Sequence, residues 1–283
     1  MRLRSLLFVP GDRPERFAKA AASGADAIIL DLEDSVSPAN KQAAREAIAD
    51  YLAGTREVVT LVRVNPLDGH MTAADVTAVI GARPDAIMLP KAEGASSIAQ
   101  LDTILRSESA SDASLPAILP IATETPSAIF TLGSYRGVRD RLVGLTWGAE
   151  DLPAAIGAAT SREADGSYTE PYRVARALTL FAAHAAGVAA IDTVFPAIKD
   201  EAGLAAYAAR ARRDGFTGMM AIHPSQVAPI NAAFTPSADE VARAQAIVDA
   251  FAANPGAGVL QVDGKMVDAP HLKQARHLLS LAD

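Results

Sequence analysis

Two strand-like runs in this sequence each lead into an acidic residue. Residues 116–126 carry Glu124 and residues 142–152 carry Asp151, with one helix-length segment between the two runs. This is the spacing of one β-α unit of a parallel sheet, in which the carboxyl ends of both strands meet at the same rim. A pair of carboxylates would suit Mg²⁺, which commonly takes one or two protein carboxylates and keeps positions open for water and substrate. On spacing alone, two solvated loop acids are the simpler interpretation, so the case for a metal depends on the rest of the chain.

The elements that must position these acids recur along the chain. Eight short apolar runs alternate with Ala-rich stretches of helical pattern, and the runs are residues 6–9, 27–32, 58–64, 86–89, 117–121, 142–145, 190–194 and 218–222. Continuous apolarity is typical of strands buried on both faces of a parallel sheet. Eight such strands with helices between them predict an α/β fold, a (β/α)8 TIM barrel, over residues 1–233. An open doubly wound sheet is the alternative, although no Gly-x-Gly-x-x-Gly motif follows any run.

Capping residues support this alternation of strands and helices. We expect Asp12 to cap a helix that has Pro14 in its first turn and ends at Gly24, and Gly187 to end a second helix over residues 175–186. Both helices follow an apolar run, as a barrel requires.

The chain changes in character after the eighth run. Ser237 to Glu240 has the pattern of a capping box that opens a helix to about Ala253, and a turn at residues 254–258 and a last helix follow. These elements are extra to a barrel. We therefore expect residues 234–283 to form a C-terminal helical arm, which either packs on its own body or reaches a neighbouring subunit.

Composition excludes several classes of function. The net charge of −7 and the pI of about 5.3 argue against nucleic-acid binding, which needs a basic face. The sequence has no Cys, so it has no disulfide, thiol nucleophile or thiolate metal site, which fits a reducing compartment. The apolar run at residues 6–9 is too short for a secretory signal, and no segment approaches the length of a membrane span. We expect a soluble cytoplasmic protein with neither nucleic acid nor membrane as a partner.

Polar residues stand where most of the predicted strands end. Catalytic residues of TIM barrels come from the carboxyl ends of several strands. In chain order, the polar residues at these ends are Asp12 and Arg13; Asp31, Glu33 and Asp34; Arg63 and Asn65; Lys91 and Glu93; Glu124; Asp151; Asp192; and His223, Ser225 and Gln226. The set is dominated by carboxylates, with a few cations among them.

Arg63 is the clearest candidate for binding an anion. It lies inside an apolar strand, where a charge is costly unless it is paired. Its planar guanidinium suits a carboxylate, and the acids at the ends of the second, fifth and sixth runs could hold it in place. The alternative is a structural ion pair with Asp31 or Glu33, which is compatible with a role in substrate binding.

Three other positions have simple structural explanations. His223 precedes a proline at the end of a strand, and a core or loop histidine explains it as well as a catalytic one. Trp147 is expected to be a packing residue, not a stacking platform. Gly148 and Ala149 could offer backbone N–H groups to an oxyanion, which by itself is a weak signal.

The motifs of this chain, taken in order, resemble those of citrate lyase β-subunit-like proteins. They are residues 4–17, 30–36, 63–65, 89–91, 124–125, 147–152, 222–226 and 264–270, with Lys41 and Ala44-Arg45 between the second and the third. The ordered set is specific and covers nearly the whole chain. The chain therefore resembles a member of the HpcH/HpaI aldolase and citrate lyase β-like superfamily.

This resemblance implies a TIM barrel that carries Mg²⁺ and cleaves a carbon–carbon bond. The substrate would be a 3-hydroxyacyl thioester of the citryl, malyl or citramalyl type, and the products an oxo acid and an acyl thioester. Glu124 and Asp151 would be the metal ligands, and Arg63 would bind the carboxylate of the oxo-acid half. Glu33 and Asp34 would lie near the metal, through its waters.

The resemblance also implies roles for residues outside the metal ligands. The segment with Gly148, Ala149 and Glu150 would line the oxo-acid pocket. Asp268 matches the aspartate that, in malyl- and citramalyl-CoA lyases, serves acid/base chemistry from a neighbouring subunit, and the family often forms trimers. Arg13, Lys19 and the loop with His223 are looser candidates for the CoA or carrier-protein arm. A Schiff base at Lys91 is not needed, because the metal can stabilise the developing charge.

Three functions remain open at this point. The first is the Mg²⁺-dependent thioester lyase. The second is a metal-dependent aldolase for free hydroxy-oxo acids, which would not need Asp268. The third is a non-catalytic thioester-binding subunit of a lyase complex, which would have little use for Glu124 and Asp151 facing Arg63. The sequence leaves open whether CoA or an acyl-carrier protein holds the acyl group.

Overall fold

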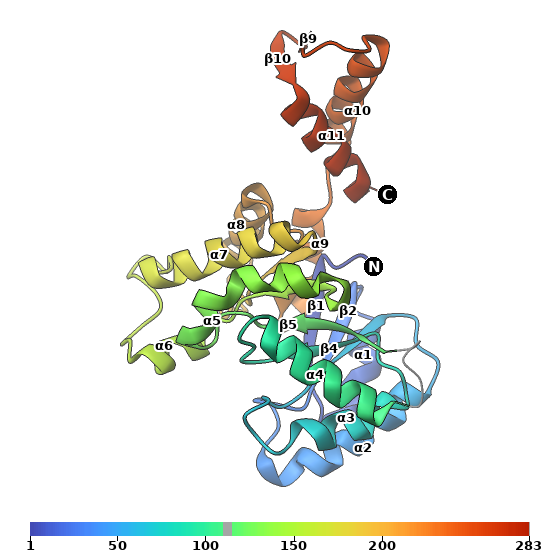
Figure 1. Cartoon of the computed structure of the whole chain (residues 1–283), viewed down its shortest axis with the longest axis vertical. Helices are drawn as coiled ribbons and strands as arrows, with labels where there is room; N and C mark the ends of the chain where they lie inside the picture. Colours follow the sequence, from blue (N-terminus) through green and yellow to red (C-terminus); the bar gives the residue numbers. More distant parts are fainter. Residues whose placement is uncertain (110–114, 283) are drawn as a thin grey trace. The chain divides into compact units, whose positions relative to one another are not determined.

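The computed structural model describes residues 1–109 and 115–282. Its first unit, Met1–Asn231, is built on parallel strands with helices around them (Figure 1). The eight strands follow the order β5-β4-β3-β2-β1-β8-β7-β6. The strands are β1 (Ser5–Pro10), β2 (Ala27–Asp31), β3 (Val59–Arg63), β4 (Ala86–Leu89), β5 (Ala117–Pro120), β6 (Gly144–Thr146), β7 (Ala189–Asp192) and β8 (Gly218–Ala221). Parallel bridges from Ile118 to Leu142 and from Ile121 to Thr146 join β5 to β6 and close the ring. The predicted (β/α)8 barrel is confirmed.

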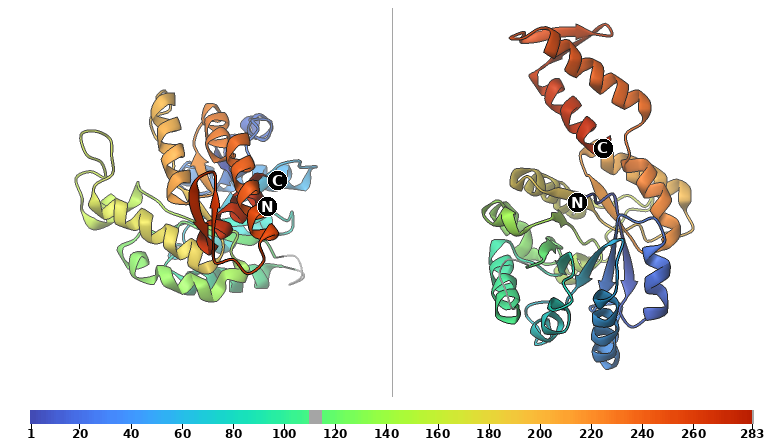
Figure 2. Two further views of the ribbon diagram at one scale, coloured as in Figure 1. Left: turned by 90° about the horizontal axis from the view of Figure 1, so that it is seen from above. Right: turned by 90° about the vertical axis from the view of Figure 1, so that its right-hand side faces the viewer.

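Helices follow the strands and lie outside the ring (Figure 2). They are α1 (Phe17–Ala21), α2 (Lys41–Ala53), α3 (Thr72–Ile80), α4 (Ala95–Glu108), α5 (Pro126–Thr131), α6 (Asp151–Ile156), α7 (Glu170–Ala186), α8 (Glu201–Asp214) and α9 (Val227–Phe234), with 3-10 segments η1 (Pro14–Arg16), η2 (Pro38–Asn40), η4 (Leu132–Arg141) and η5 (Pro224–Gln226). Gly187 ends α7 in the left-handed conformation, as expected from its sequence position.

The interior of the barrel explains why the strand sequences are apolar without alternation. Ile29, Leu61 and Met88 point into a buried core cluster, while their neighbours along each strand pack against the helices. All five residues of β2 are buried. Parallel pairing in register places Asp31 at the end of β2 directly opposite Arg63 at the end of β3. The core therefore fixes which polar side chains are neighbours at the carboxyl rim.

The predicted start of the first helix is wrong in one detail. Arg13, not Asp12, is the residue before η1, and no side chain caps this segment. The Asp12 carboxylate instead accepts a hydrogen bond from the Asn40 side-chain amide at 2.8 Å. Asp12 therefore joins the loop after β1 to the segment before α2 and does not start a helix.

In the second unit, Ala232–Asp283, two helices pack against each other, and Ala244 and Ala275 are buried. Helix α10 (Ala238–Ala253) begins with the predicted capping box of Ser237 and Glu240. A two-stranded hairpin, β9 (Val259–Val262) and β10 (Lys265–Asp268), connects it to α11 (Ala269–Ala282). This hairpin was not predicted from the sequence.

No helix within residues 1–109 and 115–282 combines the length and the apolar character that crossing a membrane requires.

Candidate active site

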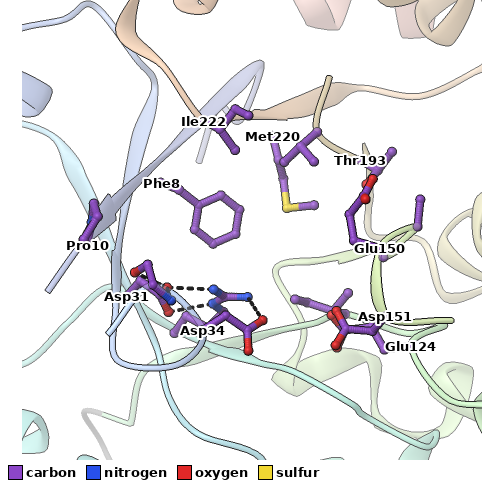
Figure 3. Close-up of a pocket in the computed structure, with 16 residues that line it drawn as sticks. Phe8, Pro10, Asp31, Asp34, Glu124, Glu150, Asp151, Thr193, Met220 and Ile222 are labelled. Carbon is purple, nitrogen blue, oxygen red and sulfur yellow. Dashed lines mark hydrogen bonds and ion pairs between the residues drawn. The ribbon is translucent and has the colours of Figure 1, made fainter. Parts of the chain in front are cut away.

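A cavity of about 410 Å³ opens at the carboxyl ends of the barrel strands (Figure 3). Most of the predicted site residues line it, namely Asp34, Arg63, Glu124, Gly148, Ala149, Glu150 and Asp151. Its other walls are Phe8, Pro10, Asp31, Ser35, Ile121, Thr193, Val194, Met220 and Ile222. Acids and one guanidinium thus face an otherwise largely apolar cavity, which is the usual character of a small-molecule site.

Arg63 is held in place by Asp31 through two hydrogen bonds. Its Nε and Nη2 each donate to a carboxylate oxygen of Asp31 at 2.7 Å. Burial would lower the pKa of Arg63, but hydrogen bonding to Asp31 and its negative charge raise it above its usual value. Burial likewise opposes ionisation of Asp31, yet Arg63 and Ser35 hold the pKa of Asp31 below its usual range. The structural ion pair considered from the sequence is therefore present, and Arg63 still lines the cavity.

Glu33 connects this arginine to a lysine across the rim. Its Oε2 lies 2.8 Å from Arg63 Nη1, and its Oε1 accepts a hydrogen bond from Lys91 Nζ at 2.6 Å. Burial raises the pKa of Glu33 against the opposing charges of Arg63 and Lys91. Asp34 is more exposed and lies 3.6 Å from Arg63 Nη1. Glu33 and Asp34 thus both face Arg63, and only Glu33 also contacts Lys91.

Glu124 is buried and is aimed by a backbone group. The N–H of Lys91 donates to Glu124 Oε2 at 2.6 Å. On the other side, a Cβ added to Gly148 would lie only 2.7 Å from Glu124 Cγ, so glycine leaves the space that the carboxylate occupies. Burial, together with the nearby charge of Asp151, raises the pKa of Glu124 to about 8.

Asp151 supplies the second carboxylate beside Glu124. It is the first residue of α6 and is half-buried, and Figure 3 places it next to Glu124 on one wall of the cavity. Lys91 Nζ lies 3.5 Å from Asp151 Oδ1. The ionised forms of two neighbouring acids repel each other, and burial adds to the cost of ionising Glu124. A divalent cation between Glu124 and Asp151 would stabilise both carboxylates in their ionised forms.

The donor set has the chemistry of a magnesium site. Across the described residues, no cluster of three or more His, Cys, Asp or Glu side chains could hold a metal. Two carboxylates with water and substrate in the other positions fit Mg²⁺, which is seldom enclosed by protein ligands alone. Glu124 and Asp151 would be those ligands.

The segment before Asp151 is fixed from behind by a buried tryptophan. Trp147 is fully buried, as predicted for a packing residue, and its Nε1 donates to Asp192 Oδ1 at 2.6 Å. The N–H of Gly148 donates to Thr123 Oγ1 at 3.3 Å, so this group is already engaged. Ala149 is buried and Glu150 is exposed, and both line the cavity. This segment forms one wall of the cavity, next to Glu124.

Five predicted residues do not line this cavity, and Glu33, which contacts Arg63 and Lys91, is one of them. Arg13 and Lys19 are exposed near the start of the chain. His223 is exposed, and its Nδ1 accepts from the Ser225 N–H at 3.2 Å, which explains it as the capping residue of η5. Asp268 belongs to the second unit, where its carboxylate contacts His271 Nδ1.

The backbone conformation of Lys91 and the partners of Asp192 were not predicted, although both residues stand at the ends of predicted strands. Lys91 is a non-glycine residue with a left-handed backbone, φ 51°, and this conformation directs its N–H at Glu124. Asp192 anchors Trp147 and is itself paired with Arg176 at 2.8 Å. The sequence does show Asp192 as a charged residue at the end of an apolar strand. It does not show its partner, Arg176, which lies 16 residues earlier on a helix.

Comparison with known proteins decides the family. The model of the HpcH/HpaI aldolase/citrate lyase family matches residues 4–224. The chain belongs to this family. A citrate lyase subunit beta-like protein of Mycobacterium tuberculosis is 39% identical over 279 residues, which are 98% of this chain and 94% of the relative. An L-malyl-CoA/beta-methylmalyl-CoA lyase of Cereibacter sphaeroides is 33% identical over 302 residues, covering 99% of this chain and 94% of the relative.

A solved structure also resembles this fold. The crystal structure of CitE from Mycobacterium tuberculosis, in complex with magnesium, acetoacetate and coenzyme A, has a TM-score of 0.84 and 37% identity. The match covers 99% of this chain and 98% of that one. Membership of the family makes this chain an enzyme of the carbon–carbon lyase class.

Proposed function

We propose that this chain is a Mg²⁺-dependent lyase that cleaves a 3-hydroxyacyl thioester into an oxo acid and an acyl thioester. One observation carries the proposal: Glu124, Asp151 and Arg63 line the same cavity at the carboxyl rim. Mg²⁺ between the two acids and the guanidinium opposite them would bind a 2-hydroxy or 2-oxo carboxylate from two sides. The CitE structure that contains magnesium, acetoacetate and coenzyme A supports the same assignment.

Each residue at the rim would have a separate role in binding the metal or the substrate. Glu124 and Asp151 would hold Mg²⁺, which as a Lewis acid would stabilise negative charge on the substrate oxygens. Arg63, kept rigid by Asp31, would bind the carboxylate of the oxo-acid half. Glu33 would remain beside Arg63 and Lys91 and balance their charges.

Bond cleavage needs two proton transfers. The substrate hydroxyl would pass its proton to water and become the oxo group, while the carbon–carbon bond breaks and its electron pair passes to the thioester enolate. The enolate carbon then takes a proton to give the acyl thioester. We assign that transfer to Asp268, which in the condensation direction would remove the same proton. The hydrogen bond from His271 lowers the pKa of Asp268, which favours the ionised form needed for the condensation direction.

The partners and the assembly are part of the same proposal. A CoA thioester is the proposed substrate, with an acyl-carrier subunit as the alternative, and Arg13, Lys19 and His223 are the weaker candidates for contacting its arm. We propose that the protein is a cytoplasmic homotrimer, in which residues 234–283 bring Asp268 to a neighbouring subunit. Mixed oligomers of Asp268→Asn and Asp151→Ala chains test this last point, because they should regain activity only if Asp268 acts across subunits.

A cleavage assay tests the proposed reaction. Malyl-CoA and citramalyl-CoA would be incubated with and without Mg²⁺, with free citrate, malate and citramalate as controls, and the release of glyoxylate, pyruvate or, from citrate, oxaloacetate would be followed. We expect metal-dependent cleavage of a CoA thioester only. Cleavage of the free acids would favour the aldolase. Binding of Mg²⁺ and oxaloacetate without cleavage of any substrate would direct the search to an acyl-carrier partner.

A further inference from the structure

Lys91 contacts both carboxylates of the proposed metal pair, Glu124 and Asp151. Its backbone N–H donates to Glu124 Oε2 at 2.6 Å, and its Nζ lies 3.5 Å from Asp151 Oδ1. The left-handed backbone at φ 51° is what allows one residue to direct its N–H and its side chain into the same site. Such a conformation is unfavourable for a side chain with a Cβ and persists where the surroundings fix it.

The Lys91 ammonium is surrounded by acids. It donates to Glu33 Oε1 at 2.6 Å as well as facing Asp151, and the lysine side chain is only 30% exposed. Arg63, the other cation of the rim, is occupied by Asp31, Glu33 and Asp34. Within the described residues, Lys91 is the one cation that forms an ion pair with Asp151.

We propose that Lys91 is a positioning residue whose ammonium stands in for the divalent cation when the metal pair is empty. In the metal-free protein it neutralises Asp151 and keeps this carboxylate beside Glu124. When Mg²⁺ arrives, the two positive charges compete for Asp151, and the ammonium keeps Glu33 as its partner. Lys91 therefore preforms the site and at the same time limits its affinity for metal. This inference rests on the proposed metal centre.

The competition predicts an effect opposite to that of a purely structural residue. Removing a structural support would loosen Glu124 and Asp151 and weaken metal binding. Removing a competing charge should strengthen metal binding while making the metal-free protein less stable. A nucleophilic role for Lys91 would predict neither effect. The hydrogen bond to Glu33 outweighs burial and raises the pKa of Lys91, so its side chain stays a protonated ammonium, whereas a nucleophile must be the neutral amine.

The test is Mg²⁺ titration by calorimetry of the wild type, Lys91→Met and Lys91→Arg, at pH 9 so that the carboxylates are ionised. Lys199→Met is the control for a lost charge, since Lys199 is exposed and does not line the cavity. We expect Lys91→Met to bind Mg²⁺ about fivefold more tightly, the size of one partly exposed ion pair. Lys91→Arg and Lys199→Met should bind like the wild type.

Thermal unfolding provides the second readout. Without metal, Lys91→Met should unfold at a lower temperature than the wild type. Saturating Mg²⁺ should raise the unfolding midpoint of Lys91→Met by more than it raises that of the wild type. Equal or weaker Mg²⁺ binding by Lys91→Met would overturn the inference while leaving the metal centre intact. A wild type that binds no Mg²⁺ would overturn the metal centre itself, and the role of Lys91 with it.

Discussion

Replacing Gly148 by alanine should damage the metal site through a single methyl group. A Cβ at this position would lie 2.7 Å from Glu124 Cγ, 3.0 Å from Oε1 and 3.2 Å from Cδ. Ordinary contacts begin at 3.4 Å, so Glu124 would have to move by about 0.7 Å. It cannot do so freely, because the Lys91 N–H already holds its other oxygen at 2.6 Å.

The size of the effect follows from the cost of overpacking. Forcing an extra methyl group into a packed site costs about 1–3 kcal/mol. If the Glu124 side chain is displaced, this energy is lost from metal binding, and the affinity for Mg²⁺ should fall by about 5- to 150-fold. If the backbone gives way, the same cost appears as lost stability. Metal affinity and unfolding must therefore be measured together.

The assay is Mg²⁺ calorimetry combined with thermal unfolding of the metal-free protein. Gly133→Ala is the matched control, because nothing lies within 4 Å of its added Cβ and its backbone is not left-handed. We expect weaker Mg²⁺ binding in Gly148→Ala and no change in Gly133→Ala. The steric argument is refuted if Gly148→Ala keeps both the affinity and the stability of the wild type.

Three further changes test other contacts of the site. Because Glu124 has a pKa of about 8, a proton competes with the metal below that pH, and raising the pH from 6 to 8 should tighten Mg²⁺ binding about 50-fold, with little gain above pH 9. Arg63→Lys should weaken oxalate or pyruvate binding by tenfold or more with Mg²⁺ present, because a point charge cannot replace both hydrogen bonds to Asp31 and still face the ligand. Trp147→Phe removes one of three donors to Asp192 Oδ1, the others being the Thr193 N–H and the Tyr207 hydroxyl, and the loss of this hydrogen bond should lower the free energy of unfolding by about 1–3 kcal/mol.

Each of these has an outcome that contradicts it. A Mg²⁺ affinity that is flat between pH 6 and 8 would show that Glu124 is ionised throughout or is not a ligand. Normal oxalate binding by Arg63→Lys would leave Arg63 with a structural role only. For Trp147→Phe the matched control is Tyr172→Phe, because the Tyr172 hydroxyl is buried and has no hydrogen-bond partner among the described residues. Equal stability losses in both variants would mean that general packing, not the bond to Asp192, is being measured.

The barrel was predictable because its strands are buried on both faces. Each of the eight apolar runs overlaps one strand, and the ends differ by no more than two residues, because the sequence alone cannot show the last hydrogen bond. Run 142–145 is an instance: the strand is Gly144–Thr146, and Leu142 forms only an isolated bridge. Because strand ends in a parallel barrel face one rim, placing Glu124, Asp151 and Arg63 near each other needed no knowledge of loops.

Features that depend on backbone geometry or on distant partners were not predictable. The left-handed conformation of Lys91 has no sequence signature, since lysine is not favoured there. Asp12 has the residue type of a helix cap, but tertiary contact with Asn40 takes its carboxylate away. The hairpin β9–β10 did have a signal, because Asp263-Gly264 is a preferred two-residue turn with both φ angles positive. The strands on either side are only four residues long, which concealed the signal.

Mg²⁺ binding to variants of the two proposed ligands tests the central claim most directly. The wild type, Glu124→Gln, Asp151→Asn and the control Asp140→Asn would be titrated with Mg²⁺, Asp140 being an exposed acid that does not line the cavity. The account predicts one Mg²⁺ per chain in the wild type and in Asp140→Asn, and a loss of affinity of about 100-fold or more in either ligand variant. Wild-type affinity in both Glu124→Gln and Asp151→Asn would contradict the account and place the metal elsewhere.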